Sequence, residues 1–284
     1  TIWSYNTLRT VRGRLGLMAE AIGRNVAVSD IPQRKVADFI RSAPSPGTHK
    51  SMRTTVIAFL NWCAGKKYLV EVPKLPTVRI DEEIPEYLLD EELEALYKVK
   101  LESVEYAVKK GFTNPATTQH WMIDAWKLAV STGMRKSEII NLKLQACSKD
   151  FITIGLHHQT KSRKQRRIPY LFEAKEVIDK YTDPDYRKSI PILAESDYLF
   201  GRKGETMAGR MSKEFSRCRN ILWPERKEIT FHSLRHTFAI RYLTAPAKGE
   251  SADYRLYKLQ RILGHASRTT TEVYLKAIPY DLQL

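Results

Sequence analysis

Six side chains in the second half of the sequence have the types needed for chemistry at a phosphodiester bond. They are two arginines, a lysine, two histidines and a tyrosine: Arg135, Lys161, His232, Arg235, His265 and Tyr274. When an oxygen attacks phosphorus, the non-bridging oxygens of the five-coordinate arrangement gain negative charge. A guanidinium donates to two such oxygens at once, so Arg135 and Arg235 are the candidates for stabilising that charge.

The local sequence places these candidates on helices. Arg135 follows Thr132-Gly133, which is typical of a helix end and a tight turn, so the arginine should open the next helix. Glu138 lies one turn further along and is placed to orient the guanidinium. His232 and Arg235 are also one helical turn apart, so both side chains can reach one ligand.

A metal site is the alternative for His232, because His236 stands four residues further along the same predicted helix. No glutamate follows the first histidine as zinc peptidases require, and no nearby Cys or Asp completes a ligand set. We therefore expect no metal here and a packing role for His236. The cysteines Cys63, Cys147 and Cys218 are far apart, which predicts core packing rather than a zinc site or disulfides.

These motifs, in this order, resemble those of the tyrosine recombinase (phage integrase) family. The resemblance is carried by Thr132-Gly133-Met134-Arg135-Lys136-Ser137-Glu138, by Lys-x-x-Lys-x-Arg-x-x-Pro from Lys161 to Pro169, by His232-Ser233-Leu234-Arg235-His236, and by Leu263-Gly264-His265 with Tyr274 nine residues later. It implies a site-specific DNA recombinase that cleaves and rejoins duplex DNA.

The resemblance assigns the cationic side chains to the phosphate. It implies that Arg135 and His265 contact the phosphate oxygens, together with Arg235 and His232. In the same family pattern Glu138 does not touch the phosphate but orients Arg135.

The resemblance also assigns the acid and the nucleophile. The spacing selects Lys161 over Lys164 as the lysine that protonates the leaving 5′ oxygen. Tyr274, rather than Tyr280 in the tail, attacks phosphorus and leaves a 3′-phosphotyrosyl link. The phenol is a weak nucleophile, so the cationic pocket or His232 must help remove its proton. Because the ester keeps the bond energy, we expect no ATP, metal or other cofactor.

The hydrophobic pattern predicts a mainly α fold with a small antiparallel β-sheet. In the second half, helical spacing recurs at residues 89–99, 121–130, 136–142, 174–181, 211–222 and 232–243. Phe151–Ile154 and Arg167–Tyr170 predict a β-hairpin whose tip, residues 155–166, carries Lys161. A third short strand is expected at residues 198–200.

Prolines and acidic residues divide the chain into two predicted domains. Pro73, Pro76 and Pro85 interrupt helix formation, and a run of acidic residues follows, as in a linker that leads into a new helix. We predict a helical core-binding domain at residues 1–78, a linker at 79–86 and a catalytic domain at 87–284. By resemblance, the two domains form a C-shaped clamp on DNA.

The charge balance indicates a nucleic-acid partner. The net charge is +15, from 47 Lys and Arg against 32 Asp and Glu, and residues 1–78 alone hold twelve Lys and Arg against four Asp and Glu. No apolar run approaches the ~20 residues of a membrane span and no signal peptide opens the chain, so we expect a soluble, cytoplasmic protein. The expected DNA-binding residues are Arg9, Arg12, Arg24, Arg34, Lys50, Arg53, Lys66, Lys67, Arg163, Lys164, Arg166 and Arg167.

The resemblance further implies partners and a biological role. The expected partners are double-stranded DNA with recombination sites, three further copies of the chain in a synaptic homotetramer, and DNA-bending or excision accessory proteins. The role is integration and excision of a phage or other mobile element. Because the sequence begins at Thr1 rather than Met, we expect a processed protein or a fragment.

Two other functional classes share parts of this pattern. A type IB topoisomerase uses the same chemistry, but the Arg-Lys-Ser-Glu and Leu-Gly-His motifs favour a recombinase. A DNA-binding protein on the same fold without chemistry is the other alternative. The presence of all six candidate side chains argues against that alternative.

Overall fold

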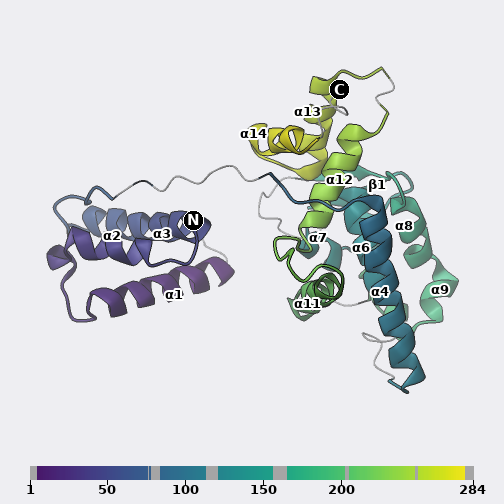
Figure 1. Ribbon diagram of the computed structural model, residues 1–284, viewed down its shortest axis with the longest axis horizontal. Coiled ribbons are helices and arrows are strands. Elements are labelled where there is room, and N and C mark those ends of the chain that lie inside the picture. Colours follow the sequence, from purple (N-terminus) through teal and green to yellow (C-terminus); the bar gives the residue numbers. More distant parts are fainter. Residues whose placement is uncertain are drawn as a thin grey trace. The chain divides into compact units, whose positions relative to one another are not determined.

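The chain divides into two compact units, residues 1–83 and residues 84–284. The computed structural model describes residues 5–75, 77, 84–112, 121–155, 165–201, 205–246 and 249–278, with side chains from residue 209 onward in the segment that begins at 205. Figure 1 shows the two units, the first in purple and blue and the second from blue through yellow. Each unit has a hydrophobic core of its own.

The first unit is a small helical domain. It contains α1 (Tyr5–Ile22), the 3-10 turn η1 (Val28–Asp30), α2 (Gln33–Arg41) and α3 (Pro46–Gly65). In α2, Val36, Phe39 and Ile40 recur at helical spacing and are buried, so one face of this helix packs into the core. Ser45 caps α3 by accepting a hydrogen bond from the Thr48 amide at 3.3 Å, with Pro46 in the first turn.

The second unit is also mainly helical, as predicted. Its α-helices are α4 (Asp90–Lys109), α6 (Trp121–Thr132), α7 (Lys136–Ile140), α8 (Ala174–Thr182), α9 (Pro184–Lys188), α10 (Pro191–Ala194), α11 (Glu205–Leu222), α12 (Ser233–Thr244), α13 (Ala252–Leu263) and α14 (Thr269–Glu272). Two 3-10 segments, η2 (Leu144–Ala146) and η3 (Val273–Ala277), complete the described elements. The six predicted helices all occur, although α4 continues ten residues beyond the predicted end at 99 and α11 begins before 211.

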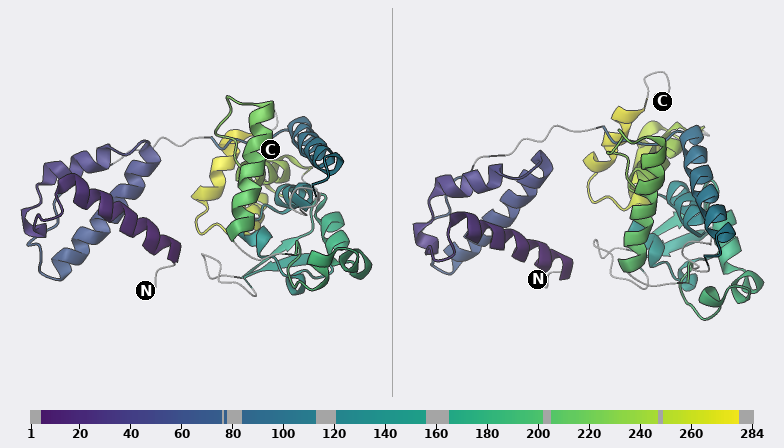
Figure 2. Two further views of the ribbon diagram at one scale, coloured as in Figure 1. Left: turned by 90° about the horizontal axis from the view of Figure 1, so that it is seen from below. Right: turned by 60° about the horizontal axis from the view of Figure 1, so that its bottom comes forward.

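The predicted hairpin strands are present as an antiparallel pair, β1 (Phe151–Ile154) and β2 (Arg166–Pro169), the second beginning and ending one residue before its predicted bounds. Phe151 pairs with Pro169 and Ile154 with Arg166. Ile152, Ile154 and Ile168 are buried, so one face of the pair packs on the core. Figure 2 shows the two strands, in teal, side by side in the second unit.

The third strand expected at residues 198–200 does not form, so that prediction was wrong. Tyr198 makes a single isolated bridge with Lys143, and the Leu199 amide donates to the Leu142 carbonyl at 2.8 Å. The chain then turns at Gly201, whose φ of +80° lies in the left-handed region. The turn ends the extended segment before a strand ladder can develop.

Helices α6 and α12 pack against each other at the centre of the second unit. Trp126 of α6 is fully buried and meets the ring of Phe215 edge-on, with centroids 5.5 Å apart. Phe215 in turn lies 6.0 Å from Phe231. Cys218 is buried in this core and Cys63 is buried in the first unit, as expected of small apolar side chains, whereas Cys147 is half-buried and packs against the core of the second unit. Within the described ranges, no helix is long and apolar enough to cross a bilayer.

Candidate active site

Arg135 lies at the junction between α6 and α7, as the sequence predicted. Gly133, with φ of +63°, ends α6, and Arg135 is the residue that precedes α7. Glu138 closes the first turn of α7, because its carboxylate accepts a hydrogen bond from the Arg135 amide at 2.8 Å. The same carboxylate lies 3.2 Å from the Arg135 guanidinium, whose side chain is 39% exposed. Glu138 thus holds both the backbone and the guanidinium of Arg135, while part of the arginine side chain faces solvent.

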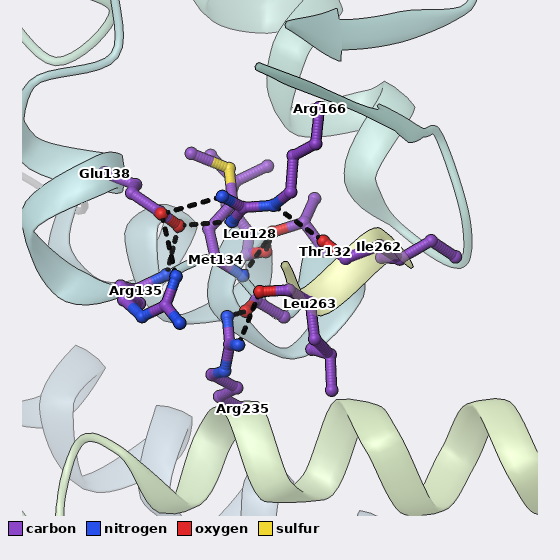
Figure 3. Close-up of polar contacts among 10 residues, drawn as sticks. Leu128, Thr132, Met134, Arg135, Glu138, Arg166, Arg235, Ile262 and Leu263 are labelled. Carbon is purple, nitrogen blue, oxygen red and sulfur yellow. Dashed lines mark hydrogen bonds and ion pairs between the residues drawn. The ribbon is translucent and has the colours of Figure 1, made fainter. Parts of the chain in front are cut away.

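Arg166, the first residue of β2, supports Glu138 from the other side. Its Nη1 donates to Glu138 Oε1 at 3.0 Å, and its Nη2 donates to Oε2 at 2.6 Å. The Nε group donates to the Ile262 carbonyl at 2.8 Å. Figure 3 shows this chain of contacts from Arg135 through Glu138 to Arg166. The Arg166 side chain is only 8% exposed, so in this structure it braces the site rather than facing solvent as an expected DNA contact would.

Arg235 is placed on α12 with its side chain buried at the centre of the site. Its two terminal nitrogens each donate to a backbone carbonyl at 2.6 Å, one to Gly133 and the other to Leu263 (Figure 3). The residue is 2% exposed. Each terminal nitrogen carries a second N–H group beyond these bonds. Although burial lowers the pKa of Arg235 to about 10, the guanidinium stays charged at neutral pH.

Two glycines allow the backbone to pass close to these arginines. Gly264, with φ of +67°, ends α13, and its amide donates to the Gln260 carbonyl at 2.9 Å. A Cβ at this position would come within 3.0 Å of Arg166 Cδ. At Gly133 a Cβ would lie 2.5 Å from a ring carbon of Phe238 and 2.6 Å from a methyl carbon of Leu263. Both positions therefore need glycine for space as well as for backbone conformation.

Tyr274, in η3, is buried between two histidines. Its hydroxyl lies 3.0 Å from His236 Nδ1 of α12. Its ring stacks on that of His265 with centroids 6.3 Å apart and an interplanar angle of 16°. His265 follows Gly264 and is itself oriented by a contact of 2.9 Å between its Nδ1 and the Thr271 hydroxyl. Tyr274 is only 2% exposed. The fold thus brings it into contact with two histidines that are distant from it in the sequence.

His232, at the start of α12, is exposed and lies beside His236 rather than beside Tyr274. The two imidazole rings meet edge-on with centroids 4.8 Å apart, while the rings of His236 and Tyr274 are 5.6 Å apart. His236 therefore takes part in a hydrogen bond to the candidate nucleophile, beyond the packing role expected for it. Its spacing from His232, on one face of one helix, was interpreted only as an alternative metal site, so the sequence did not predict the contact with Tyr274.

Burial and positive charge determine the protonation of the site. Burial lowers the pKa of His265 to about 3 and that of His236 to about 4, and Arg235 acts in the same direction on both. Both rings are therefore neutral at neutral pH. Burial raises the pKa of the Tyr274 phenol, and Arg235 and Arg135 oppose this without reversing it. The cations thus favour the ionised form of a phenol that burial keeps protonated.

Lys161, Arg163 and Lys164 lie outside the described residues, so their placement is not part of the site as described. The strands that flank them are described, and β2 contributes Arg166 to the site. Arg167 is exposed, with its guanidinium 4.6 Å from the centre of the Phe151 ring. Arg166 pairs with Ile154 of β1, so this end of the strand pair lies beside the arginine cluster.

The expected DNA-binding residues of the first unit are mostly at its surface. Those exposed are Arg9, Arg12, Arg24, Arg34, Lys50, Lys66 and Lys67, whereas Arg53 is half-buried and donates to the Leu75 carbonyl at 3.3 Å. Arg24 pairs with Glu20 at 2.7 Å, which neutralises part of its charge. In the described part of the chain, no group of three His, Cys, Asp or Glu residues is arranged to hold a metal ion.

Comparison with known proteins identifies relatives of the second unit. Residues 86–279 match the phage integrase family. Tyrosine recombinase XerC of Staphylococcus epidermidis is 30% identical over 197 residues, which cover 67% of this chain and 57% of that protein. XerC of Leptospira interrogans is 32% identical over 145 residues, covering 51% and 43%. The chain thus spans about half the length of these curated relatives.

Solved structures share the fold of the whole chain. A lambda integrase (residues 75–356) dimer bound to a COC′ core site matches with a TM-score of 0.69 at 18% identity, over 96% of this chain and 89% of that one. The XerH site-specific recombinase bound to palindromic difH substrate matches with a TM-score of 0.67 at 20% identity, over 97% and 78%. At these identities the likeness establishes the fold.

Proposed function

The chain belongs to the phage integrase family of tyrosine recombinases, and we propose from this premise that it is a site-specific recombinase acting through a 3′-phosphotyrosyl intermediate. One observation carries the proposal. The hydroxyl of Tyr274 lies among two neutral histidines and is acted on by Arg235 and Arg135, so a phenol and the cations that bind a phosphate share one pocket.

In the proposed reaction the arginines hold the phosphate first. Arg135 is partly exposed, and Arg235, which also hydrogen-bonds the Tyr274 side chain, has N–H groups beyond its two carbonyl bonds. Both arginines can therefore donate to non-bridging oxygens. His265 and His232 supply further contacts. Because the guanidinium of Arg235 is fixed by two carbonyls before DNA arrives, it needs no reorganisation when charge develops.

The chemistry then exchanges one phosphoester for another. The Tyr274 oxygen forms a bond to phosphorus and the bond from phosphorus to the 5′ oxygen breaks, with Lys161 giving that oxygen its proton. Attack by a 5′ hydroxyl on the phosphotyrosine reverses each change. Since the number of phosphoester bonds is conserved, the reaction proposed here needs no ATP. The two arginines, rather than a metal ion, stabilise the charge that develops at phosphorus in this proposal.

We propose DNA duplexes as the substrate and a homotetramer as the working assembly. A lambda integrase tetramer bound to a Holliday junction has the same fold, with a TM-score of 0.67, and in this chain the exposed arginines and lysines of the first unit supply the charge for binding DNA. DNA-bending or excision proteins would complete the assembly. The biological role we propose is integration and excision of a mobile element.

The test is the covalent intermediate. Duplexes bound by the protein are selected from genomic DNA, nicked near the preferred site, and incubated with the wild type, Tyr274→Phe or Tyr280→Phe. An SDS-resistant adduct from the wild type and Tyr280→Phe, absent from Tyr274→Phe, supports the proposal. Tight binding without an adduct from any variant contradicts it.

The same material separates the remaining alternatives. Cutting without sequence preference, with relaxation of supercoiled DNA, would indicate a topoisomerase instead. Bound sites at the two ends of one genomic element would support integration and excision. A single bound site outside any such element would contradict that role while leaving the chemistry intact.

A further inference from the structure

We propose that His236 is the base that accepts the hydroxyl proton of Tyr274 during cleavage. The inference rests on the function proposed above. It assigns a role in the reaction to a residue for which the sequence predicted only packing. His232 was the histidine expected to help remove this proton. The two alternatives differ in geometry, because only one of the two rings is placed next to the phenol.

The hydrogen bond between His236 and Tyr274 has the geometry of a proton transfer. His236 Nδ1 lies 3.0 Å from the Tyr274 hydroxyl, within the reach required of a general base. His232 meets the ring of His236 edge-on, with centroids 4.8 Å apart, whereas the phenol has its hydrogen bond with His236. For the phenol to donate, His236 must carry its own proton on Nε2.

The surroundings of His236 keep it ready to accept. The titratable or charged groups acting on it are His232 and Arg235 of its own helix, and Tyr274 of η3 faces it. Burial, with the two groups of its own helix, keeps the ring neutral at neutral pH. When an anionic phosphate enters the pocket, its charge favours protonation of His236. Substrate binding therefore makes the base stronger at the moment it is needed.

The proton count balances in both directions. On cleavage, the Tyr274 O–H bond breaks, an N–H bond forms at His236 Nδ1, the Tyr274 oxygen bonds to phosphorus, and the leaving 5′ oxygen takes a proton from Lys161. On rejoining, the 5′ hydroxyl returns its proton to Lys161 as it attacks. His236 then returns its proton to the departing Tyr274 oxygen. The enzyme ends in its starting protonation state.

The experiment compares two substitutions in single-turnover cleavage of the nicked duplexes selected above. His236→Phe removes the acceptor and keeps a ring of similar size. His236→Asn offers an amide oxygen as an acceptor but cannot take a proton. We expect both to slow adduct formation about 10²- to 10⁴-fold at neutral pH, with DNA affinity and melting temperature close to those of the wild type. Both rates should recover as the pH rises toward the phenol pKa.

A chemically altered nucleophile gives a second readout. With a fluorinated tyrosine of lower phenol pKa at position 274, the His236→Asn enzyme should regain much of its missing rate, while the enzyme with His236 gains little. A purely structural hydrogen bond predicts the reverse: His236→Asn would cleave like the wild type, with no altered pH profile.

The outcomes separate this inference from the function on which it rests. Wild-type rates and pH dependence in both variants would overturn the role of His236 and leave the recombinase intact. The expected pH dependence in His232→Asn instead would overturn it in favour of His232. If the wild type forms no adduct at all, the proposed function fails and the inference fails with it.

Discussion

Arg166 holds both carboxylate oxygens of Glu138, through bonds of 3.0 Å and 2.6 Å from its two terminal nitrogens. The pair is nearly buried, with side-chain exposures of 8% and 7%. Burial favours the neutral acid, but Arg166 and Arg135 outweigh it and hold the pKa of Glu138 below its usual value. The first residue of β2 is thereby coupled to the partly exposed Arg135.

Removing Arg166 alone should destabilise the second unit and disable the site. In Arg166→Met the Glu138 carboxylate stays buried with Arg135 as its only remaining arginine partner, so we expect a loss of about 3 kcal/mol in the free energy of unfolding. Urea denaturation measures this loss. Arg167→Met, which changes the exposed neighbour on the same strand and removes its contact with the Phe151 ring, should cost about 1 kcal/mol or less. Equal losses in the two variants would show that the ion pair has no special weight.

Replacing both partners should separate stability from chemistry. In Arg166→Met with Glu138→Leu no buried charge is left unpaired, so the double variant should be more stable than the sum of the single losses predicts. Adduct formation should nevertheless stay low, because the carboxylate that orients Arg135 is gone. A double variant that recovers activity would refute the orienting role of Glu138.

Gly133→Ala should be markedly destabilising because the added methyl group meets Phe238 at 2.5 Å and Leu263 at 2.6 Å. We expect a loss of about 2 to 3 kcal/mol, from overpacking together with a strained backbone. Gly111→Ala is the matched control: its φ is also positive, at +74°, but nothing lies within 4 Å of the added Cβ. The difference between the two melting temperatures isolates the packing contribution.

Acidification should destabilise the second unit before its carboxylates titrate. In the unfolded chain a histidine takes up a proton near pH 6.5, whereas folded His236 and His265 do so only at about pH 4 and 3. The unfolded state therefore binds more protons below pH 6.5, and stability falls as the pH falls toward 4.

The size of this effect can be measured in one variant. Between pH 6.5 and 5, His236→Phe should lose about 1 kcal/mol less stability per pH unit than the wild type. Tyr274→Phe, which retains both histidines, should follow the wild-type slope. Identical slopes in all three proteins would mean that His236 takes up its proton over the same pH range in the folded and the unfolded state.

Binding of DNA by the first unit should depend on particular exposed arginines. Arg9 and Arg12 are exposed, one turn apart on α1, and in no ion pair with the described residues. The double substitution to Gln should reduce the slope of log Kd against log salt by about 2, because each phosphate that the protein no longer neutralises lowers it by about 0.9. Arg24→Gln should change the slope less, because Glu20 already pairs with Arg24. A large effect of Arg24 alone would contradict this assignment.

Local patterns in the sequence predicted the elements well. The helical spacing at residues 121–130 and 174–181 corresponds to α6 and α8, and the Thr-Gly turn placed Arg135 before α7 with Glu138 within its first turn. In each case the interactions that decide the structure lie within a few residues. The predicted strand at residues 198–200 failed because Gly201 turns the chain there, and a short apolar run alone does not reveal such a turn.

Partnerships between distant side chains could not be predicted in this way. Glu138 and Arg166 are 28 residues apart, and His236 and Tyr274 are 38 residues apart. No periodicity connects such pairs, because the packing of separate elements brings them together. The family resemblance supplied the site as a set of residues, whereas the contacts that orient each member came only from the structure.

The two carbonyls that receive Arg235 belong to residues at the ends of α6 and α13, 102 and 28 positions away from it. One guanidinium thus connects the ends of two helices and, in the proposed reaction, also binds the phosphate. Evolution should rarely replace such a residue, because its substitution would destabilise the fold and also remove a group that the proposed reaction needs. The hydroxyl of Tyr274 contacts side chains, among them His236, and bonds to neither of these helix ends. A lineage that turned this scaffold into a passive DNA-binding protein would therefore give up the tyrosine first and keep the arginine.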